Sequence, residues 1–291
     1  MVYVEAYESR ITPQHPFWQS KTASQYMNFH VVTLFPEVVD AYASASILGR
    51  AQKEKKLSVK TYQLRDFVTN PVKPQSGHGA DKWFYKRVDD KPYGGGPGMV
   101  LQAEPFVRAV EVIQKKISKI SRPRLDKSAK KSTLTFQSKK PKILITSAGG
   151  KPLTNAFAKA LTKHKDVIIL CGRYEGIDAR VKKVLTSLGA KVEEVSVGPY
   201  ILTGGELPAL TIIDTTARQI PGVLGTYESL EEGRVASHEI YTRPEIFEYK
   251  NTKGVIKSYK VPKVLLSGNH AKMDEWKTRT PHVVSSKTKT K

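Results

Sequence analysis

The stretch that decides the fold runs from 167 to 220: VIILCGRYEGIDARVKKVLTSLGAKVEEVSVGPYILTGGELPALTIIDTTARQI. Predicted strands at 167–171 and 191–197 are each followed by a glycine-bearing turn and then by a segment with helical spacing, 177–189 and 206–220. In the second of these segments, apolar residues recur at the spacing of one helix face: Leu207, Leu210, Ile213, Ala217 and Ile220. Strands that alternate with helices pair in parallel, so the stretch predicts an α/β fold.

The same alternation extends towards the N-terminus. Further strands are predicted in HVVTLF (30–35), LSVKTYQL (57–64) and KILIT (142–146), and further helices in AEPFVRAVEVIQKKI (103–117) and NAFAKALTKH (155–164). Another helix is predicted to begin at Pro36, because proline suits a first helical turn. We therefore expect a parallel sheet with helices on both faces, beginning near Met27.

The remaining segments lie outside this pattern. Residues 1–26 show no periodicity, and we expect a disordered extension or a wrongly assigned start. The domain that begins at residue 27 is expected to end at 221, with a linker at 222–240 and a short basic region at 241–291. The polar, lysine-rich insert 118–142 is expected to be a mobile loop.

Composition indicates a polyanionic partner. The 291 residues include 48 Lys and Arg against 27 Asp and Glu, a formal net charge of +21. The tail KTKTK (287–291) explains part of this excess as solvated charge, but nucleic acid is the partner that explains the rest. The one cysteine, Cys171, rules out an intramolecular disulfide and fits a reducing cytoplasm. No apolar run reaches 18 residues, so no membrane partner is expected.

The sequence lacks the motifs of several common catalytic and nucleotide-binding sites. The chain has no G-x-x-x-x-G-K-[ST] loop, no H-E-x-x-H helix and no G-x-S-x-G elbow. No metal ligands are predicted, and a role for Mg²⁺ stays open. Cys171 ends an apolar strand, which favours a buried small side chain over a nucleophile.

Three glycine-rich turns are the candidates for a ligand site. They lie at 93–98, 172–176 and 198–205, and the last two directly follow predicted strands. Ligands of α/β sheets bind beyond the carboxyl ends of strands, and glycine lets a ligand approach the backbone. The alternative is that the glycines only allow tight connections.

Six motifs in this order resemble the bacterial tRNA (guanine-N1)-methyltransferase family. They are VDDKPYGGGPGMVL (88–101), LCGRYEGIDARV (170–181), SVGPYILTGGELPAL (196–210), PGVLG (221–225), YTRPEIF (241–247) and VPKVLLSGNHAKMDEW (261–276). The resemblance covers about residues 27–276. It implies methylation of the guanosine immediately 3′ of the anticodon, position 37, with S-adenosyl-L-methionine as the methyl donor.

The resemblance also implies a fold and a site. The family is knotted (SPOUT-like): its C-terminal strands and loops form a trefoil knot that holds the cofactor, and it is a homodimer whose sites are shared between protomers. A small helical C-terminal region, shortened here, would bind tRNA. By motif match the cofactor-binding residues are Tyr93, Gly172, Glu175, Val197, Gly198, Pro199, Tyr200, Ile201, Leu202, Gly204, Gly205 and Pro208. Arg218 falls on the catalytic arginine, and Gly205→Val is expected to fill space that the cofactor needs.

The chain departs from the family at two positions of the implied site. Pro199 stands where the family usually has Asp, and it removes a backbone donor. The linker TYESLEEGRVASHEIYTRP (226–244) lacks the family's catalytic Asp, and Glu232 is the nearest carboxylate. Glu232 is therefore the candidate general base for N1–H. One alternative is that Glu228, Glu231 and Glu232 are all solvated linker charges. The others are that Glu228 or Glu231 is the base, or that Arg218 alone makes N1 acidic enough.

Two other functions compete with this one. A non-catalytic tRNA-binding relative would keep the fold and lose the base. A nucleotide-binding enzyme unrelated to RNA would leave the charge of +21 unexplained.

Overall fold

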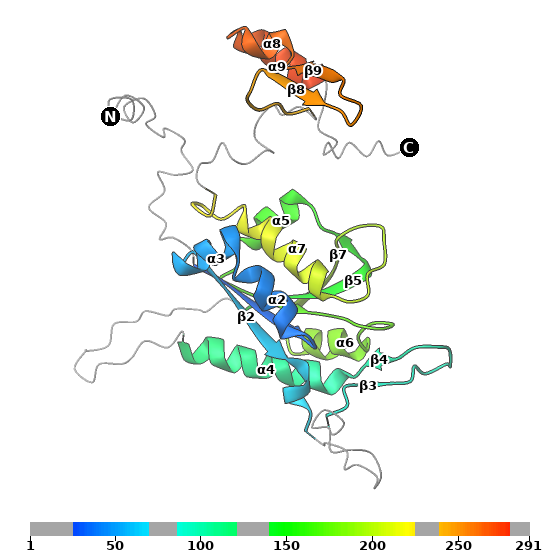
Figure 1. Ribbon diagram of the computed structural model, residues 1–291. Coiled ribbons are helices and arrows are strands. Elements are labelled where there is room, and N and C mark those ends of the chain that lie inside the picture. The colour runs from blue at the N-terminus through cyan, green and yellow to red at the C-terminus, as the bar shows by residue number, and fades with distance from the viewer. Residues whose placement is uncertain (1–25, 70–85, 121–139, 225–238, 280–291) are drawn as a thin grey trace, which may run out of the picture. The chain divides into compact units, whose positions relative to one another are not determined.

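The structure is a computed structural model that describes residues 26–69, 86–120, 140–224 and 239–279 (Figure 1). The chain divides into two compact units between Leu224 and Gly225, within the segment predicted to be a linker. The first unit holds the α/β sheet and the second is a small C-terminal unit.

A five-stranded sheet forms the centre of the first unit. Its strand order is β2-β1-β6-β5-β7, and every neighbouring pair is parallel. The strands are β1 (Met27–Thr33), β2 (Leu57–Gln63), β5 (Lys142–Pro152), β6 (Asp166–Leu170) and β7 (Lys191–Ser196). The predicted parallel α/β sheet is therefore confirmed.

Helices cover both faces of this sheet (Figure 1). One face packs against α4 (Ala103–Ile120) and α6 (Arg180–Ser187), and the other against α2 (Pro36–Ala43), α3 (Ser46–Lys53), α5 (Asn155–Leu161) and α7 (Glu206–Ala217). Successive residues of β6 supply the two cores in turn: Val167 and Ile169 face α7, whereas Ile168 and Leu170 face α4. A strand buried on both sides needs a continuous apolar run, which is why β6 contains no polar residue after Asp166.

Two features at the carboxyl ends of the strands position the site. Strand β5 is interrupted, because both Thr146 and Lys151 pair with Val195, so residues 147–150 bulge out of the ladder. A two-stranded ribbon of β3 (Asp89–Asp90) and β4 (Val100–Leu101) carries the glycine-rich loop 93–98 between its strands. A short 3-10 turn, Leu64–Phe67, follows β2.

The C-terminal unit differs from the helical region that the sequence predicts. It begins with an antiparallel hairpin of β8 (Ile246–Lys250) and β9 (Ile256–Lys260), followed by α8 (Lys263–Leu266) and α9 (His270–Arg279). The helices agree with the prediction, and the hairpin corrects it. Gly254 allows the reversal, since its φ of +81° lies in the left-handed region that favours glycine.

Candidate functional site

A large pocket lies at the carboxyl ends of β5, β6 and β7. Its volume is about 1020 Å³, at the upper end of what ligand sites in proteins occupy. Three segments supply most of its wall: residues 145–148 at the interruption of β5, the turn 172–179 after β6, and the loop 194–205 after β7. The edge of a parallel sheet where adjacent strands end is the usual ligand position in this fold class.

Most of the predicted cofactor residues meet in this pocket. Those that line it are Gly172, Glu175, Val197, Gly198, Tyr200, Ile201, Leu202, Gly204, Gly205 and Pro208. Pro199 lies in the same loop but does not line the pocket, and neither Tyr93 nor Arg218 does. Glu232 lies outside the described residues, as do Glu228 and Glu231.

Hydrogen bonds tie the turn after β6 to the loop after β7. The Gly205 amide donates to the Gly172 carbonyl at 2.7 Å, and the Gly172 amide donates to Thr146 Oγ1 at 3.2 Å. A Cβ atom on Gly205 would lie 2.7 Å from the Gly172 nitrogen and would also collide with the Thr146 hydroxyl. Gly205 is thus required by its close contact with β5 and β6. The expectation that Gly205→Val fills cofactor space needs correction, because that side chain would first disrupt the sheet edge.

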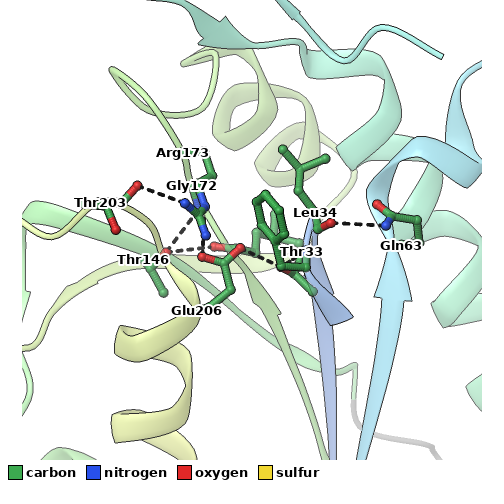
Figure 2. A network of polar contacts seen from close by, with 10 residues as sticks. Thr33, Leu34, Gln63, Thr146, Gly172, Arg173, Thr203 and Glu206 are labelled. Atoms are coloured by element: carbon green, nitrogen blue, oxygen red, sulfur yellow. Dashed lines mark hydrogen bonds and ion pairs between the residues drawn. The ribbon is translucent and has the colours of Figure 1, made fainter. Parts of the chain in front are cut away.

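A buried polar network braces the same loop (Figure 2). Glu206, 3% exposed, begins α7 and accepts a hydrogen bond from Thr33 Oγ1 at 2.7 Å. Its other oxygen lies 3.1 Å from Arg173 Nε, an ion pair without the alignment of a hydrogen bond. A carboxylate at a helix N-terminus is also favoured by the helix dipole.

The Arg173 side chain extends this network into the pocket wall. Its Nη1 donates to the Thr203 carbonyl at 3.4 Å, and its guanidinium lies 4.3 Å from the ring centroid of Phe35. A guanidinium stacked on an aromatic face and paired with a carboxylate has little freedom. Arg173 therefore links β1, the turn after β6 and the loop after β7 into one rigid wall.

The turn 172–177 contains an unusual backbone conformation. Tyr174 has a φ of +58°, in the left-handed region that few side chains adopt, and Gly176 follows at +125°. Backbone bonds fix the turn against the β3–β4 ribbon: Glu175 N donates to Met99 O at 3.1 Å, and Leu101 N donates to Gly176 O at 3.0 Å. Two of the three predicted glycine-rich turns are therefore neighbours. Non-glycine residues held at positive φ often mark functional sites.

A second cavity adjoins the first through this turn. It is lined by the β3–β4 ribbon, α4 and α6, and it shares Glu175 and residues 177–179 with the first pocket. Tyr93 lines this second cavity and is 99% exposed. The sequence-based expectation that Tyr93 binds the cofactor stays a prediction.

Two titratable groups at or beside the pocket have shifted pKa values. Hydrogen bonding from Arg180, with Nη2 2.6 Å from Asp178 Oδ2, lowers the pKa of the Asp178 carboxyl. Burial raises the pKa of the Cys171 thiol well above its ordinary value, with Glu206 adding to the effect. Cys171 is 1% exposed, as expected for a packing residue.

Comparison with known proteins identifies the family. The sequence profile of the tRNA (guanine-1)-methyltransferase family, TrmD, matches residues 27–291. The chain belongs to this family. It is 37% identical to the tRNA (guanine-N(1)-)-methyltransferase of Clostridioides difficile over 255 residues, which cover 86% of this chain and 90% of that protein. The enzyme of Pasteurella multocida is 36% identical over 253 residues, 86% of this chain and 84% of that protein.

A solved structure agrees with the sequence relatives. The crystal structure of the tRNA (m1G37) methyltransferase from Aquifex aeolicus matches with a TM-score of 0.59 at 32% sequence identity. The match covers 86% of this chain and 87% of that one. The resemblance stated from six motifs is therefore confirmed.

Part of the pocket wall was not predicted from the sequence. Thr146, Ser147 and Ala148 line the pocket from the interruption of β5, and Thr146 Oγ1 accepts a hydrogen bond from the Gly172 amide. A usable signal was present, because KILIT ends directly before Ser-Ala-Gly-Gly at 147–150. This predicted strand is followed by glycines, as are the predicted strands at 167–171 and 191–197, so the same reasoning would have placed a third loop at the pocket.

Arg218 lies at the opposite end of α7 from the pocket. The helix runs from Glu206 to Ala217, and Arg218 is its C-cap. At a rise of 1.5 Å per residue, Arg218 is about 18 Å from Glu206 along the helix axis. Arg218 is half-buried there and does not line the pocket of its own chain.

Within the residues that the structure describes, no group of three or more His, Cys, Asp or Glu side chains could hold a metal ion. The helices of those same residues include none that is long and apolar enough to cross a membrane.

Proposed function

We propose that this chain methylates N1 of a guanine in tRNA, with S-adenosyl-L-methionine as methyl donor and position 37 as target. The reaction class follows from the family, and the supporting observation is the pocket at the carboxyl ends of β5, β6 and β7. The net charge of +21 suits a tRNA substrate. Such an enzyme works where tRNA is made, in the cytoplasm.

The pocket fits the cofactor by its donors and its apolar lining. The backbone N–H groups of Tyr200, Ile201 and Leu202 donate no hydrogen bond within the described part of the chain, although all three residues line the pocket. They can therefore donate to acceptor atoms of a bound adenine ring or ribose. Ile177, Val197 and Pro208 add apolar surface. We infer that this loop forms the family's trefoil knot.

The bound cofactor supplies an electrophilic methyl group on a sulfonium. A bond forms between guanine N1 and that methyl carbon while the sulfur–carbon bond breaks, and N1 loses its proton to a base. Negative charge that develops towards O6 is stabilised by a nearby cation. We assign that cation to Arg218 and the base to Glu232, which the sequence suggests in place of the family's aspartate.

Because Arg218 lies about 18 Å along α7 from Glu206, it is proposed to serve the pocket of a second copy. The protein would then act as a homodimer with shared sites. Mixing Arg218→Ala chains with chains defective in cofactor binding tests this directly. Activity should return in the mixture, because mixed dimers contain one complete site. Failure to regain activity, with mixed dimers present, would contradict sharing.

The activity itself is tested by mass spectrometry of tRNA incubated with the protein and cofactor. One methyl group on N1 of guanosine 37 is expected. Unmodified tRNA that nevertheless binds tightly would favour the alternative, a non-catalytic relative. Repeating the reaction with a chelator and with added Mg²⁺ tests a metal requirement.

Glu232→Gln tests the base. Single-turnover methylation should fall about 10²-fold or more, the scale for losing a general base, while cofactor and tRNA affinities stay constant. Glu231→Gln is the matched control and should retain activity. Full turnover by Glu232→Gln would exclude Glu232, and loss of activity in Glu231→Gln or Glu228→Gln would move the role to that neighbour.

A further inference from the structure

The β8–β9 hairpin of the C-terminal unit has a well-defined turn and two exposed faces. Every residue of both strands is exposed. The Asn251 side chain accepts hydrogen bonds from Lys253 N at 3.0 Å and Val255 N at 2.9 Å, and Gly254 adopts a positive φ. These contacts fix the turn and hence the strand register.

The register gathers aromatic side chains on one side. Phe247 lies opposite Tyr259, and Tyr249 lies opposite Lys257, so these four residues share one face. We call them the aromatic face. The rings of Phe247 and Tyr259 have centroids 6.4 Å apart, and the three aromatic residues are 52–56% exposed.

The opposite face of the hairpin has no aromatic residue. It carries Ile246, Glu248, Lys250, Ile256, Ser258 and Lys260. Glu248, the strands' single acidic residue, lies there beside Ser258 Oγ at 3.4 Å. The aromatic face therefore carries positive charge only, from Lys257.

This combination fits RNA with unpaired bases. An isolated two-stranded hairpin is only marginally stable in water and gains stability when one of its faces is covered. Three exposed aromatic rings on the same face therefore indicate a binding surface. Bases stack on aromatic rings irrespective of sequence, and lysines pair with the adjoining phosphates. Paired stems hide their base faces, whereas loops expose them. An acidic protein partner is favoured less, because the aromatic face offers it one lysine for charge pairing and three rings that acidic side chains do not complement.

We propose that the aromatic face of the β8–β9 hairpin stacks unpaired bases of a tRNA loop, with Lys257 against a neighbouring phosphate. The inference rests on the proposed function for tRNA as the substrate. It adds a base-stacking platform formed by Phe247, Tyr249 and Tyr259, separate from the methyl-transfer pocket.

The test measures binding of the full chain to fluorescein-labelled unmodified tRNA. Tyr249→Ala should weaken Kd about 5- to 150-fold, the range for losing one base–aromatic stack. Tyr249→Phe keeps the ring and should bind like the wild type. Ile256→Ala, on the opposite face at 60% exposure, is the matched control and should also bind normally. Tyr249→Ile keeps an apolar residue that favours strands but has no aromatic face, so it should weaken binding like Tyr249→Ala even with the hairpin intact.

The salt dependence separates stacking from charge. Tyr249→Ala should leave the slope of log K against log salt unchanged, because no phosphate contact is lost. Lys257→Gln should reduce that slope by about 0.7–0.9, the contribution of one phosphate contact.

Three results would overturn the inference. The first is wild-type tRNA affinity in Tyr249→Ala, and the second is an equal loss of tRNA affinity in Ile256→Ala. The third is that Tyr249→Ala dissociates an oligomer of the protein in sedimentation experiments without RNA. The last would assign the face to a second copy of the chain. These outcomes are distinct from failure of the proposed function, which would appear as no methyl transfer by the wild-type protein.

Discussion

Replacing Thr33 by valine should destabilise the α/β unit although it preserves side-chain volume. Thr33 is fully buried, and its hydroxyl donates to the buried Glu206 carboxylate at 2.7 Å. Valine removes that donor. A hydrogen bond to a charged group contributes about 1.5–3 kcal/mol. The hydroxyl also accepts from the Phe35 amide at 3.0 Å, and valine removes that contact too, which adds to the loss. We therefore expect a loss of at least about 1.5–3 kcal/mol.

Thr33→Ser is the matched control. It keeps the hydroxyl and loses one methyl group, which costs about 0.8–1.5 kcal/mol in a core. Urea unfolding followed by circular dichroism at one protein concentration gives the difference between the variants. If packing alone mattered, Thr33→Ser would lower the free energy of unfolding more than Thr33→Val. If the hydrogen bond to Glu206 matters more, Thr33→Val lowers it more. Valine no more destabilising than serine would refute the reasoning.

The same pair of variants has a functional readout. Glu206 pairs with Arg173, which donates to the Thr203 carbonyl in the pocket loop. Thr33→Val should therefore weaken cofactor binding in calorimetry more than Thr33→Ser does. Equal affinities would show that the network stabilises the fold without shaping the pocket.

Three further predictions concern the sheet edge, the turn and the basic insert. Gly205→Ala should cost about 1–3 kcal/mol through overpacking against β5 and β6, whereas Gly149→Ala, whose Cβ meets nothing within 4 Å, should be neutral in the same unfolding assay. Arg180→Ala should raise the pKa of Asp178 in a carboxyl NMR titration, because hydrogen bonding from the Arg180 side chain lowers it. In the wild type this pair stabilises the fold at pH values above the pKa of the unfolded chain, and that contribution is lost as pH falls through the lowered pKa. An unchanged titration would show that the pair is absent in solution. Deleting 120–140 should reduce the salt dependence of tRNA binding, and an unaltered slope would show that the insert is only a solvated loop.

The sheet could be predicted because its signals are local. The buried run of β6 and the helical spacing in α7 each occupy a few consecutive residues, and strand–helix alternation then dictates parallel pairing. The glycine turns could be located for the same reason. The hairpin was missed because every residue of β8 and β9 is exposed, so no buried face marks them as strands.

The contacts that define the pocket could not be predicted in the same way. Thr33 and Glu206 are 173 positions apart, and nothing near either residue indicates the hydrogen bond between them. Gly205 illustrates the limit, because its sequence context suggested room for a ligand. Its neighbours in space are Thr146 and the Gly172 backbone. The space left by the missing side chain of Gly205 is therefore filled by the protein itself and not by a ligand.

The length of α7 separates two tasks of the proposed enzyme. Glu206 begins the helix and braces the wall of its own pocket, whereas Arg218 ends it about 18 Å away. In the proposed dimer, one rigid helix would then serve its own pocket at one end and the partner's pocket at the other. Under this proposal, a change at the Glu206 end should alter how the cofactor is held, because the Arg173 contact moves with it. A change at Arg218 should leave that wall intact and remove the cation proposed to stabilise the guanine O6 charge. Cofactor affinity and the rate of methyl transfer should therefore be separable by mutation, even though a single helix carries both residues.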